Sequence, residues 1–304
     1  MASARLPVAS PSFTPLPYGL FSVVGDGSTA DRHWKNGVIH QPDACEPALS
    51  TLNPCPAVTG LGKSPSATGI GTNGASPFTI YAWIDCGPVT QAPAEADRRV
   101  RAALDRGAPR AVELVFWTGS VSTTGAPEIS PHLAADSEVL DVGDRATVQL
   151  AASPVTTGST TVDVVEAIGL LEEGLGDCYG GVGVIHVPRT ALAHLAAEGL
   201  IERDGSQLKT IGGNLIAAGA GYPGTGPSGA DPAVGHEWFY ATGAVDMYEG
   251  NIVMTSSYAE AVDRANNSLV LIAERTYVLT WDCCLFAANV RLGGSDTGTV
   301  LSPD

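Results

Sequence analysis

The chain has 304 residues, of which 44% are apolar and only 16% are charged, with 36 glycines and 21 prolines. This composition allows a sizeable core and favours much strand and loop. Acidic residues outnumber basic ones by 32 to 16, a formal net charge of -16, which argues against a tight sequence-reading nucleic-acid protein because phosphate contacts require Lys and Arg.

The six cysteines give no sign of a metal or redox centre, because no two of them stand in a C-x-x-C motif. We expect their thiols to stay mostly free in a reducing, cytosolic setting, with a disulfide between Cys45 and Cys55 as the alternative. Cys283 and Cys284 lie in an apolar run and are predicted to be small core residues. We find neither a secretory signal nor an apolar run of the roughly 18 residues that a membrane span needs.

The N-terminal segment, residues 1–30, is predicted to be an extended arm. Pro7, Pro11, Pro15 and Pro17 exclude a helix there. Because the arm has few apolar groups with which to bury itself, we expect it to be either disordered or held by other parts of the chain and other copies.

Residues 31–75 contain Asn36-Gly37, the strongest short hairpin signal. Trp34 and Ile39 flank this predicted turn, and a stretch rich in Gly, Ser, Pro and Thr follows. An isolated hairpin is marginal in water. We therefore expect the two large apolar side chains to bury against another surface.

The next segment combines a strand with a helix. Residues 77–86 are rich in strand formers, and apolar residues recur at helical spacing from Ala92 onward. Gly107 and Pro109 are expected to break or kink this helix, with a second piece over 110–117. The basic run that begins at Arg98 is interpreted as a solvated or salt-bridged helix face. Residues 119–160 are predicted to be mostly loop, with a short strand at 146–150.

The remaining chain mixes helices and strands, which indicates an α+β protein. A helix over 161–175 is capped by Thr160 or Thr161, and a second helix opens at Pro188 and closes at Gly199. Strands are predicted at 182–187, 215–218, 236–247, 250–257, 269–281 and 284–292, with a turn at Asn266-Asn267 between two of them.

One glycine-rich motif fits the G-x-G-x-x-G pattern of dinucleotide-binding proteins. It runs from Gly219 to Gly224 after an apolar strand. The dinucleotide interpretation requires a helix to begin in the loop, and Pro223 with the glycines and prolines that follow prevents this. We predict a rigid turn where chains approach closely and no cofactor.

No group of residues calls for a catalytic explanation. His236-Glu237 begins like a zinc-protease motif, but Tyr240 stands where the second histidine is needed. Cys178 and His186 lack the loop signature of a nucleophile pair. We predict that the chain is not an enzyme and binds no metal, with a hydrolase using an uncharted Cys/His site as an alternative.

The order of these elements resembles that of the HK97-like major capsid proteins of tailed bacteriophages, closest to those of actinobacterial phages. The resemblance covers most of residues 76–292 and rests on order, spacing and character. The segments that carry it are 77–86, 110–117, 162–175, 180–188, 219–227, 238–243 and 273–277.

This resemblance implies a division of the chain. The parts are an N-terminal arm (1–30), an extended E-loop hairpin (31–75), a peripheral domain in two pieces (76–160 and 232–304) with a spine helix over 92–117, and an axial domain (161–231). Under this division, the arm and the E-loop have no core of their own because they pack against another copy of the chain.

The resemblance also implies a function, which is that of a major capsid protein self-assembling into hexamers and pentamers of an icosahedral shell around double-stranded DNA. Its partners are many copies of itself, with portal, scaffolding and decoration proteins as further ones, and DNA held without sequence-specific binding; no membrane is involved. The expected location is the virion, assembled in the host cytoplasm. Alternatives are an encapsulin-like cellular shell or another phage structural subunit such as a tail tube, although the helices argue against a tube. The expected assembly contacts are Trp34, Asn36, Gly37, Ile39, Gly219, Gly221, Tyr222, Pro223 and Gly224.

Overall fold

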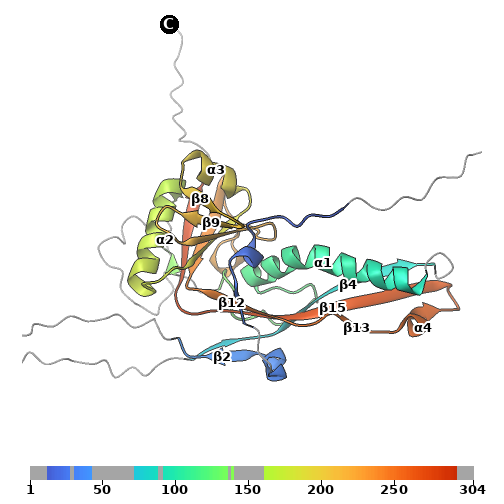
Figure 1. Ribbon diagram of the computed structural model, residues 1–304. Helices are drawn as coiled ribbons and strands as arrows, with labels where there is room; N and C mark the ends of the chain where they lie inside the picture. Colours follow the sequence, from blue (N-terminus) through green and yellow to red (C-terminus); the bar gives the residue numbers. More distant parts are fainter. Residues whose placement is uncertain are drawn as a thin grey trace, which may run out of the picture.

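A computed structural model describes residues 12–27, 31–42, 72–87, 92–135, 138–139 and 161–292 (Figure 1). A Cys45–Cys55 disulfide, the strand at 146–150 and a cap by Thr160 lie outside these residues. The described chain is built from two sheets, a two-stranded ribbon and four α-helices. The α+β class predicted from the sequence is therefore confirmed.

The six-stranded sheet is organised around the 14-residue strand β15, and we call it the long sheet. On one side β4 pairs with it antiparallel over nine residue pairs, and on the other side β12, β13 and β14 pair with it in succession. The strands of this sheet are β1 (Gly25–Asp26), β4 (Phe78–Cys86), β12 (Val245–Glu249), β13 (Val253–Met254), β14 (Val262–Asp263) and β15 (Ser268–Trp281). The predicted strands at 77–86 and 269–281 are confirmed.

The second sheet has eight strands and is called the mixed sheet, because β7 and β10 at its centre run parallel while their outer neighbours β11 and β9 run antiparallel to them. Its strands are β5 (Glu138–Val139), β6 (Val162–Asp163), β7 (Val184–Pro188), β8 (Ile201–Asp204), β9 (Gln207–Thr210), β10 (Leu215–Gly219), β11 (His236–Thr242) and β16 (Leu285–Arg291). The single strand predicted over 236–247 is wrong. The chain turns at Gly243, so β11 belongs to the mixed sheet and β12 to the long sheet.

The long helix α1 (Pro93–Thr118) is continuous, so the predicted break at Gly107 and Pro109 is wrong. A proline inside a helix costs roughly 3 kcal/mol. Against this, α1 buries a stripe that includes Leu104 and Val112 on the long sheet, and each such side chain contributes about 1.5–3 kcal/mol. Packing over the whole stripe therefore outweighs the local penalty, and Figure 1 shows α1 lying along the β4–β15 pair.

Two shorter helices cover the outer face of the mixed sheet: α2 (Val164–Cys178) and α3 (Ala191–Ala197). Asp163, and not a threonine, caps α2 by accepting a hydrogen bond from the amide of Glu166 at 2.8 Å. Pro188 is the last residue of β7 and does not open α3. Each predicted helix is thus present, but begins about three residues later. A single-turn helix, α4 (Tyr258–Ala261), adjoins β14 in the long sheet.

The hairpin predicted with its turn at Asn36-Gly37 is wrong. A 3-10 helix, Arg32–Asn36, occupies the predicted turn region, because the Asp31 side chain caps it by accepting from the amide of His33. The strand after it, β2 (Val38–His40), pairs with β3 (Asn73–Ala75). The connection of this β2–β3 ribbon is therefore residues 41–72.

Two cores hold the elements together. One lies between α1, the long sheet and the inner face of the mixed sheet, and the other lies between α2, α3 and the outer face of the mixed sheet. A disulfide joins Cys178, at the end of α2, to Cys284, next to β16, so the expectation of mostly free thiols is wrong for this pair. In the described part of the chain, no helix combines the length and the apolar character needed to cross a bilayer.

Candidate assembly surfaces

One face of the long sheet presents apolar side chains to solvent. Along β4, alternate residues pack under α1, and the residues between them point to the opposite side. On that side Tyr81 is 47% exposed and Trp83 is 61% exposed, with their rings 6.0 Å apart. Three aliphatic side chains on paired strands share the face. We call this surface the outer sheet face, consisting of Tyr81, Trp83, Val253, Val270 and Ile272.

A groove runs beside the outer sheet face, between β4 and α1. It has a volume of about 500 Å³ and is lined on the strand side by Ile80, on the helix side by Leu114, and also by Val121. Among the described residues, β4 pairs only with β15. The other edge of β4 is thus a long strand edge with few charges, a feature that proteins normally cover by pairing or packing.

The ribbon base contains four of the predicted contact residues. Trp34 is half-buried against Tyr248 of β12 in the same chain, with ring centroids 5.9 Å apart. Gly37 has a φ of +108°, and a side chain there would meet the carbonyl of Ala75. Asn36 is exposed, and Ile39 is 79% exposed. Trp34 therefore attaches the ribbon to β12 of its own chain, Gly37 allows a close approach to Ala75 within the ribbon, and Ile39 is exposed.

The glycine loop after β10 contains the other five predicted contact residues. A side chain at Gly219 would meet the ring of Tyr222, and a Cβ at Gly221 would lie 2.1 Å from the carbonyl oxygen of Arg110 in α1. The close backbone approach expected at Gly221 is thus made within one chain. Gly224 has a φ of +75°, and Pro223 is exposed. No α-helix begins in this loop, only the 3-10 turn Pro227–Gly229, which agrees with the argument against a dinucleotide site.

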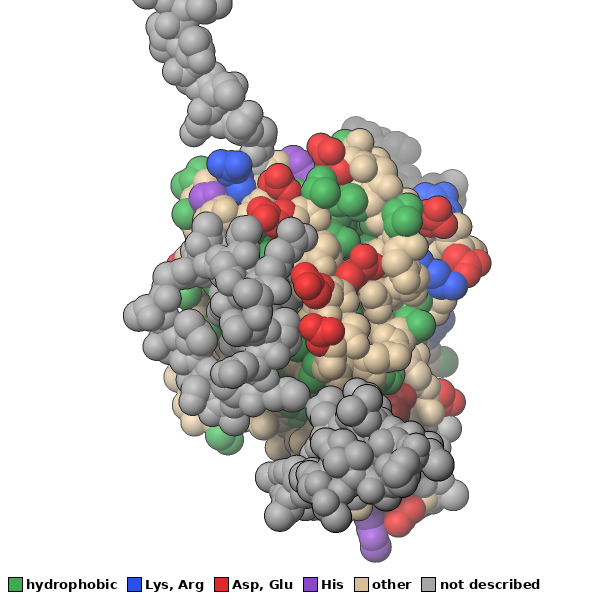
Figure 2. Space-filling model, turned by 90° about the vertical axis from the view of Figure 1, so that its left-hand side faces the viewer, with side chains coloured by type: hydrophobic (Ala, Val, Ile, Leu, Met, Phe, Trp, Pro, Cys, Tyr) green, Lys and Arg blue, Asp and Glu red, His purple; other side chains and the backbone are tan. Residues whose placement is uncertain are grey.

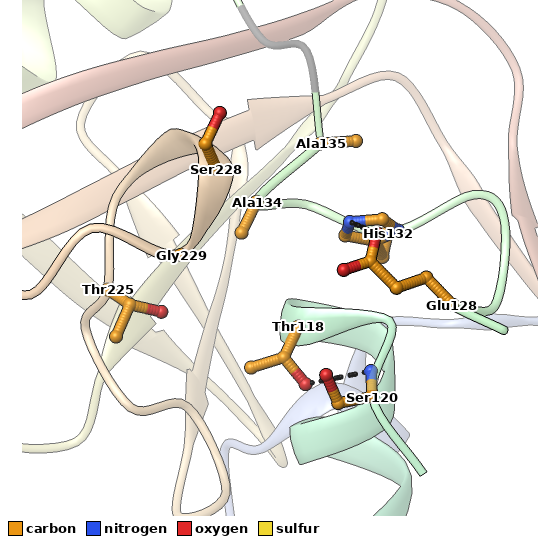
Figure 3. A pocket seen from close by; sticks show the side chains of 9 residues that line it. All are labelled: Thr118, Ser120, Glu128, His132, Ala134, Ala135, Thr225, Ser228 and Gly229. Carbon is orange, nitrogen blue, oxygen red and sulfur yellow. Dashed lines mark hydrogen bonds and ion pairs between the residues drawn. The ribbon is translucent and has the colours of Figure 1, made fainter. Parts of the chain in front are cut away.

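A polar pocket of about 610 Å³ lies at the C-terminal end of α1 (Figure 3). His132 Nδ1 lies 2.8 Å from the carbonyl of Ile129, and Nε2 is 3.9 Å from Glu128 Oε2. Thr118 Oγ1 donates to the carbonyl of Leu114 and accepts from the amide of Ser120. The polar atoms of His132 and Thr118 thus contact groups that lie close to them in the sequence.

The residues considered for catalysis are used structurally. His186 is fully buried, with its two ring nitrogens 3.1 Å from Tyr222 Oη and 3.1 Å from Thr242 Oγ1. Desolvation lowers its pKa to about 3, so the ring is neutral near pH 7. Cys178 is in the disulfide, and Glu237 Oε1 accepts a hydrogen bond from Thr190. No group of three or more His, Cys, Asp or Glu side chains within the described ranges could hold a metal ion.

Charges are distributed unevenly over the surface. The basic run of α1 is neutralised within the helix, where Arg98 and Arg99 both contact Glu95 and Arg101 contacts Asp97, as expected from the sequence. Helix α2 has four acidic residues and no basic one. Figure 2, which views the molecule from the α2 side of Figure 1, shows acidic side chains spread over the middle of this face. This face will therefore repel other polyanions.

Comparison with solved structures finds proteins that match over nearly the whole chain. The capsid of a native GTA particle matches with a TM-score of 0.57 at 10% identity, covering 95% of this chain and 95% of that one. The capsid of an empty GTA particle gives 0.55 at 10% identity, with 95% of each chain covered. A chain of Mycobacterium phage Bobi gives 0.52 at 11% identity, with 96% of each chain covered.

No model of a protein family matches the sequence, and no protein of curated function does either. At identities near these values the structural matches establish the fold. Each match covers 95% or 96% of this chain, so it concerns the whole fold and not one sheet alone. The chain is therefore an α+β protein that shares the fold of the GTA capsid chains, which agrees with the resemblance to HK97-like capsid proteins predicted from its sequence.

Proposed function

We propose that this chain is a major capsid protein whose copies assemble as hexamers and pentamers into a closed icosahedral shell around double-stranded DNA. The observation that carries the proposal is the end-to-end match to the capsid of the GTA particle, in which 95% of each chain is covered. A shared domain alone would leave large unmatched parts. Here only about 5% of each chain is left unmatched.

The exposed apolar groups support assembly. Soluble monomers rarely expose contiguous apolar surface without a partner for it. This chain exposes the outer sheet face, the adjoining groove and, on the ribbon, Ile39. Phe13 and Leu16 of the N-terminal segment are 50% and 64% exposed. In a shell these groups would be buried by neighbouring copies.

In this proposal each part of the chain has the role of the corresponding part of a capsid subunit. Residues 1–30 serve as the arm and 31–75 as the E-loop, which would lie over a neighbouring subunit. Residues 76–160 with 232–304 form the peripheral domain around the spine helix α1. Residues 161–231 form the axial domain, whose glycine loop at 219–224 would approach a symmetry axis. Portal, scaffolding and decoration proteins are the further partners of such a shell.

The charge balance fits a container for DNA. A net charge of -16 and the acidic α2 face oppose tight binding of a polyanion. A closed wall confines DNA without phosphate contacts, so the packaged DNA needs no sequence-specific binding. Assembly in the host cytoplasm and residence in the virion follow from this role.

Sedimentation velocity and negative-stain electron microscopy of the purified full chain test the proposal. We expect capsomers or closed shells at micromolar concentration. The double variant Tyr81→Ser with Trp83→Ser should stay folded and lose shells, whereas Val165→Ser, which changes an exposed apolar residue on α2, should assemble normally. A wild-type chain that stays a monomer under all conditions contradicts the proposal.

The contents of purified particles separate this function from that of an encapsulin-like shell. Nuclease-protected double-stranded DNA of uniform length supports the capsid. A protein cargo without DNA supports the cellular shell of the same fold.

A further inference from the structure

The segment formed by residues 17–27, which we call the strap, crosses from the mixed sheet to the long sheet. Its last residues pair with the long sheet as β1, parallel to β12. The 3-10 turn η1 (Leu20–Ser22) within it touches both β10 and α1. The strap therefore lies against the strand that leads into the glycine loop and against the helix that this loop contacts.

Apolar anchors hold the strap in place. Tyr18 packs against the core under α2 and α3 and lies 5.3 Å from the Arg203 guanidinium. Leu20 is fully buried and Val23 is nearly so, both in the core under α1. The arm expected from the sequence is thus held, in these residues, by its own chain.

The residue before the glycine loop, Ala218, is joined to the strap through both of its backbone polar groups. Its amide donates to the carbonyl of Tyr18 at 2.7 Å. Its carbonyl accepts from Arg189 Nη1 at 3.3 Å, and the same Nη1 donates to the carbonyl of Pro17 at 2.9 Å. The strap and the stem of the loop thus share one guanidinium as well as a direct backbone hydrogen bond.

Glu113 of α1 joins the two segments a second time. Its side chain is buried, and its Oε1 accepts from the amide of Leu20 at 3.0 Å. Its Oε2 accepts from the amide of Gly221 at 2.8 Å, and the amide of Ala220 also bonds to this carboxylate. The two oxygens belong to one rigid planar group, so a shift of the oxygen that holds the strap also shifts the oxygen that holds the loop.

The backbone fits closely at both contacts. A Cβ at Gly19 would lie 2.4 Å from Glu113 Oε1, and a Cβ at Gly221 would lie 2.8 Å from the Cβ of Glu113. Tyr18 has a φ of +68°, a left-handed conformation that a tyrosine rarely adopts and that persists only where surrounding contacts impose it. The strap is therefore held in this shape by its contacts with the loop stem and α1.

We propose that the strap and the glycine loop form one coupled unit, with Glu113 and Arg189 as positioning residues, so that the loop keeps its shape only while the strap is bound. If the strap left, the Glu113 carboxylate and the Arg189 guanidinium would each lose one partner. The carboxylate would then be free to turn, and its hydrogen bond to Gly221 would weaken. Coupling of this kind is reciprocal, so a displaced loop would also loosen the strap.

The coupling gives the N-terminal segment a role at the exposed side of the loop. Ala220 and Pro223 are exposed, whereas Gly221 and Tyr222 between them are buried. The positions of the two exposed residues are therefore set by the anchored residues between them. This role rests on the proposed function, in which the loop approaches a symmetry axis, so that the strap would set the surface that a neighbouring copy meets.

Amide hydrogen exchange of the full chain, followed by mass spectrometry, tests the coupling with two matched variants of the strap. Gly19→Ala places a methyl group 2.4 Å from Glu113 Oε1. We expect peptides over 17–24 and over 218–224 both to exchange roughly 10-fold faster or more, the ratio that corresponds to the loss of one hydrogen bond to a charged group. Gly25→Ala crowds the other end of the strap in the same way, with a methyl group 2.2 Å from Asp246 Oδ1, and should leave 218–224 unchanged.

A double-mutant cycle separates coupling from a general loosening of the chain. Glu113→Gln keeps one acceptor oxygen but presents N–H groups to the other amide, so it can hold one segment and not both. In that background, Gly19→Ala should no longer change the exchange of 218–224, because the link has already been removed. Where Glu113→Gln fails to fold, the two glycine variants decide the matter by themselves.

Three results overturn the proposal. They are unchanged exchange of 218–224 in Gly19→Ala, an equal increase in Gly25→Ala, and an increase that persists in the Glu113→Gln background. All variants are compared in the same assembly state, and the coupling is measured within one chain. A chain that never forms shells therefore refutes the proposed function but leaves this test of the coupling intact.

Discussion

Tyr222 donates its hydroxyl hydrogen to Nδ1 of His186, 3.1 Å away, inside the core. The direction of this hydrogen bond follows from the contact that the other ring nitrogen, Nε2, makes with Thr242. Thr242 Oγ1 donates to the carbonyl of Gly243 at 2.9 Å, so its lone pairs accept from His186 Nε2–H at 3.1 Å. The imidazole is thereby fixed as a neutral Nε2–H tautomer that joins β7, β11 and the glycine loop.

This arrangement predicts a loss of stability in acid. The folded-state pKa of His186 is about 3, below the ordinary value of about 6.5. Between these values the unfolded chain takes up a proton that the folded chain refuses, so stability falls as pH falls. Lowering the pH from 6.5 to 4.5 should cost about 2 kcal/mol through this group.

Urea unfolding of wild type and His186→Gln at both pH values isolates the contribution of His186 to the pH dependence of stability. Glutamine can donate and accept hydrogen bonds without titrating. The raised pKa of Glu113 acts in the opposite direction, stabilising at low pH and fading as pH rises, but it is present in both proteins and cancels. Equal pH slopes for the two proteins would refute the assignment.

Two glycines should respond oppositely to the same substitution. Gly221→Ala places a methyl group 2.1 Å from the Arg110 carbonyl and should cost roughly 1–3 kcal/mol or more. Gly107, in the exposed part of α1, has nothing within 4 Å of the point that an alanine methyl group would occupy. Gly107→Ala should therefore raise stability by roughly 0.5–1 kcal/mol, the helix preference of alanine over glycine. Urea midpoints that move in the same direction would contradict the packing described for the loop.

Substitutions of Trp34 and Ile39 should distinguish attachment of the ribbon to its own chain from assembly with other copies. Trp34→Ala removes the contact with Tyr248 and should speed amide exchange in β2, at a cost of about 1–2 kcal/mol because the ring is only half-buried. Ile39→Ser changes a side chain that is 79% exposed and should alter subunit stability by less than about 0.5 kcal/mol, yet weaken shells. Unchanged exchange in Trp34→Ala would mean that the ribbon is held by something else.

The disulfide closes a loop between residues 106 positions apart. Replacing both Cys178 and Cys284 with alanine should lower stability by about 2–5 kcal/mol, mainly because the unfolded chain gains freedom. Cys86, which has a free thiol, serves as the control: Cys86→Ala should leave stability nearly unchanged. Peptide mapping without reductant should recover the linked pair, and alkylation of both cysteines in the native protein would contradict the bond.

The sequence predicted the elements whose patterns are decided locally. The alternation along 77–86 and the apolar runs at 182–187 and 269–281 each identify strands, because burial on one or both faces shows in the residue types. The same alternation places Tyr81 and Trp83 on one side of β4. Two aromatic side chains on the outward face were the available signal for the outer sheet face, and it was missed.

The errors arose where distant contacts decide the local structure. Asn36-Gly37 has a hairpin composition, but Asp31 caps a 3-10 helix there and Trp34 packs on Tyr248, more than 200 residues away. Pro109 predicts a helix break, but the stripe of α1 is stabilised by strands that pair with β15. In the sequence, Glu113 looks like an ordinary helix residue, and only the fold brings the amides of Leu20 and Gly221 to its carboxylate.

Strand β15 has a mechanical consequence. Backbone hydrogen bonds in an antiparallel pair lie across the strand axis, and β15 shares nine consecutive residue pairs with β4 on one side and five with β12 on the other. A pull along the strand loads these bonds in shear, all at once, whereas a pull across it would open them one after another. The subunit is therefore stiff in one direction and can peel in the other, and tension in any larger structure would be carried best along the line of β15.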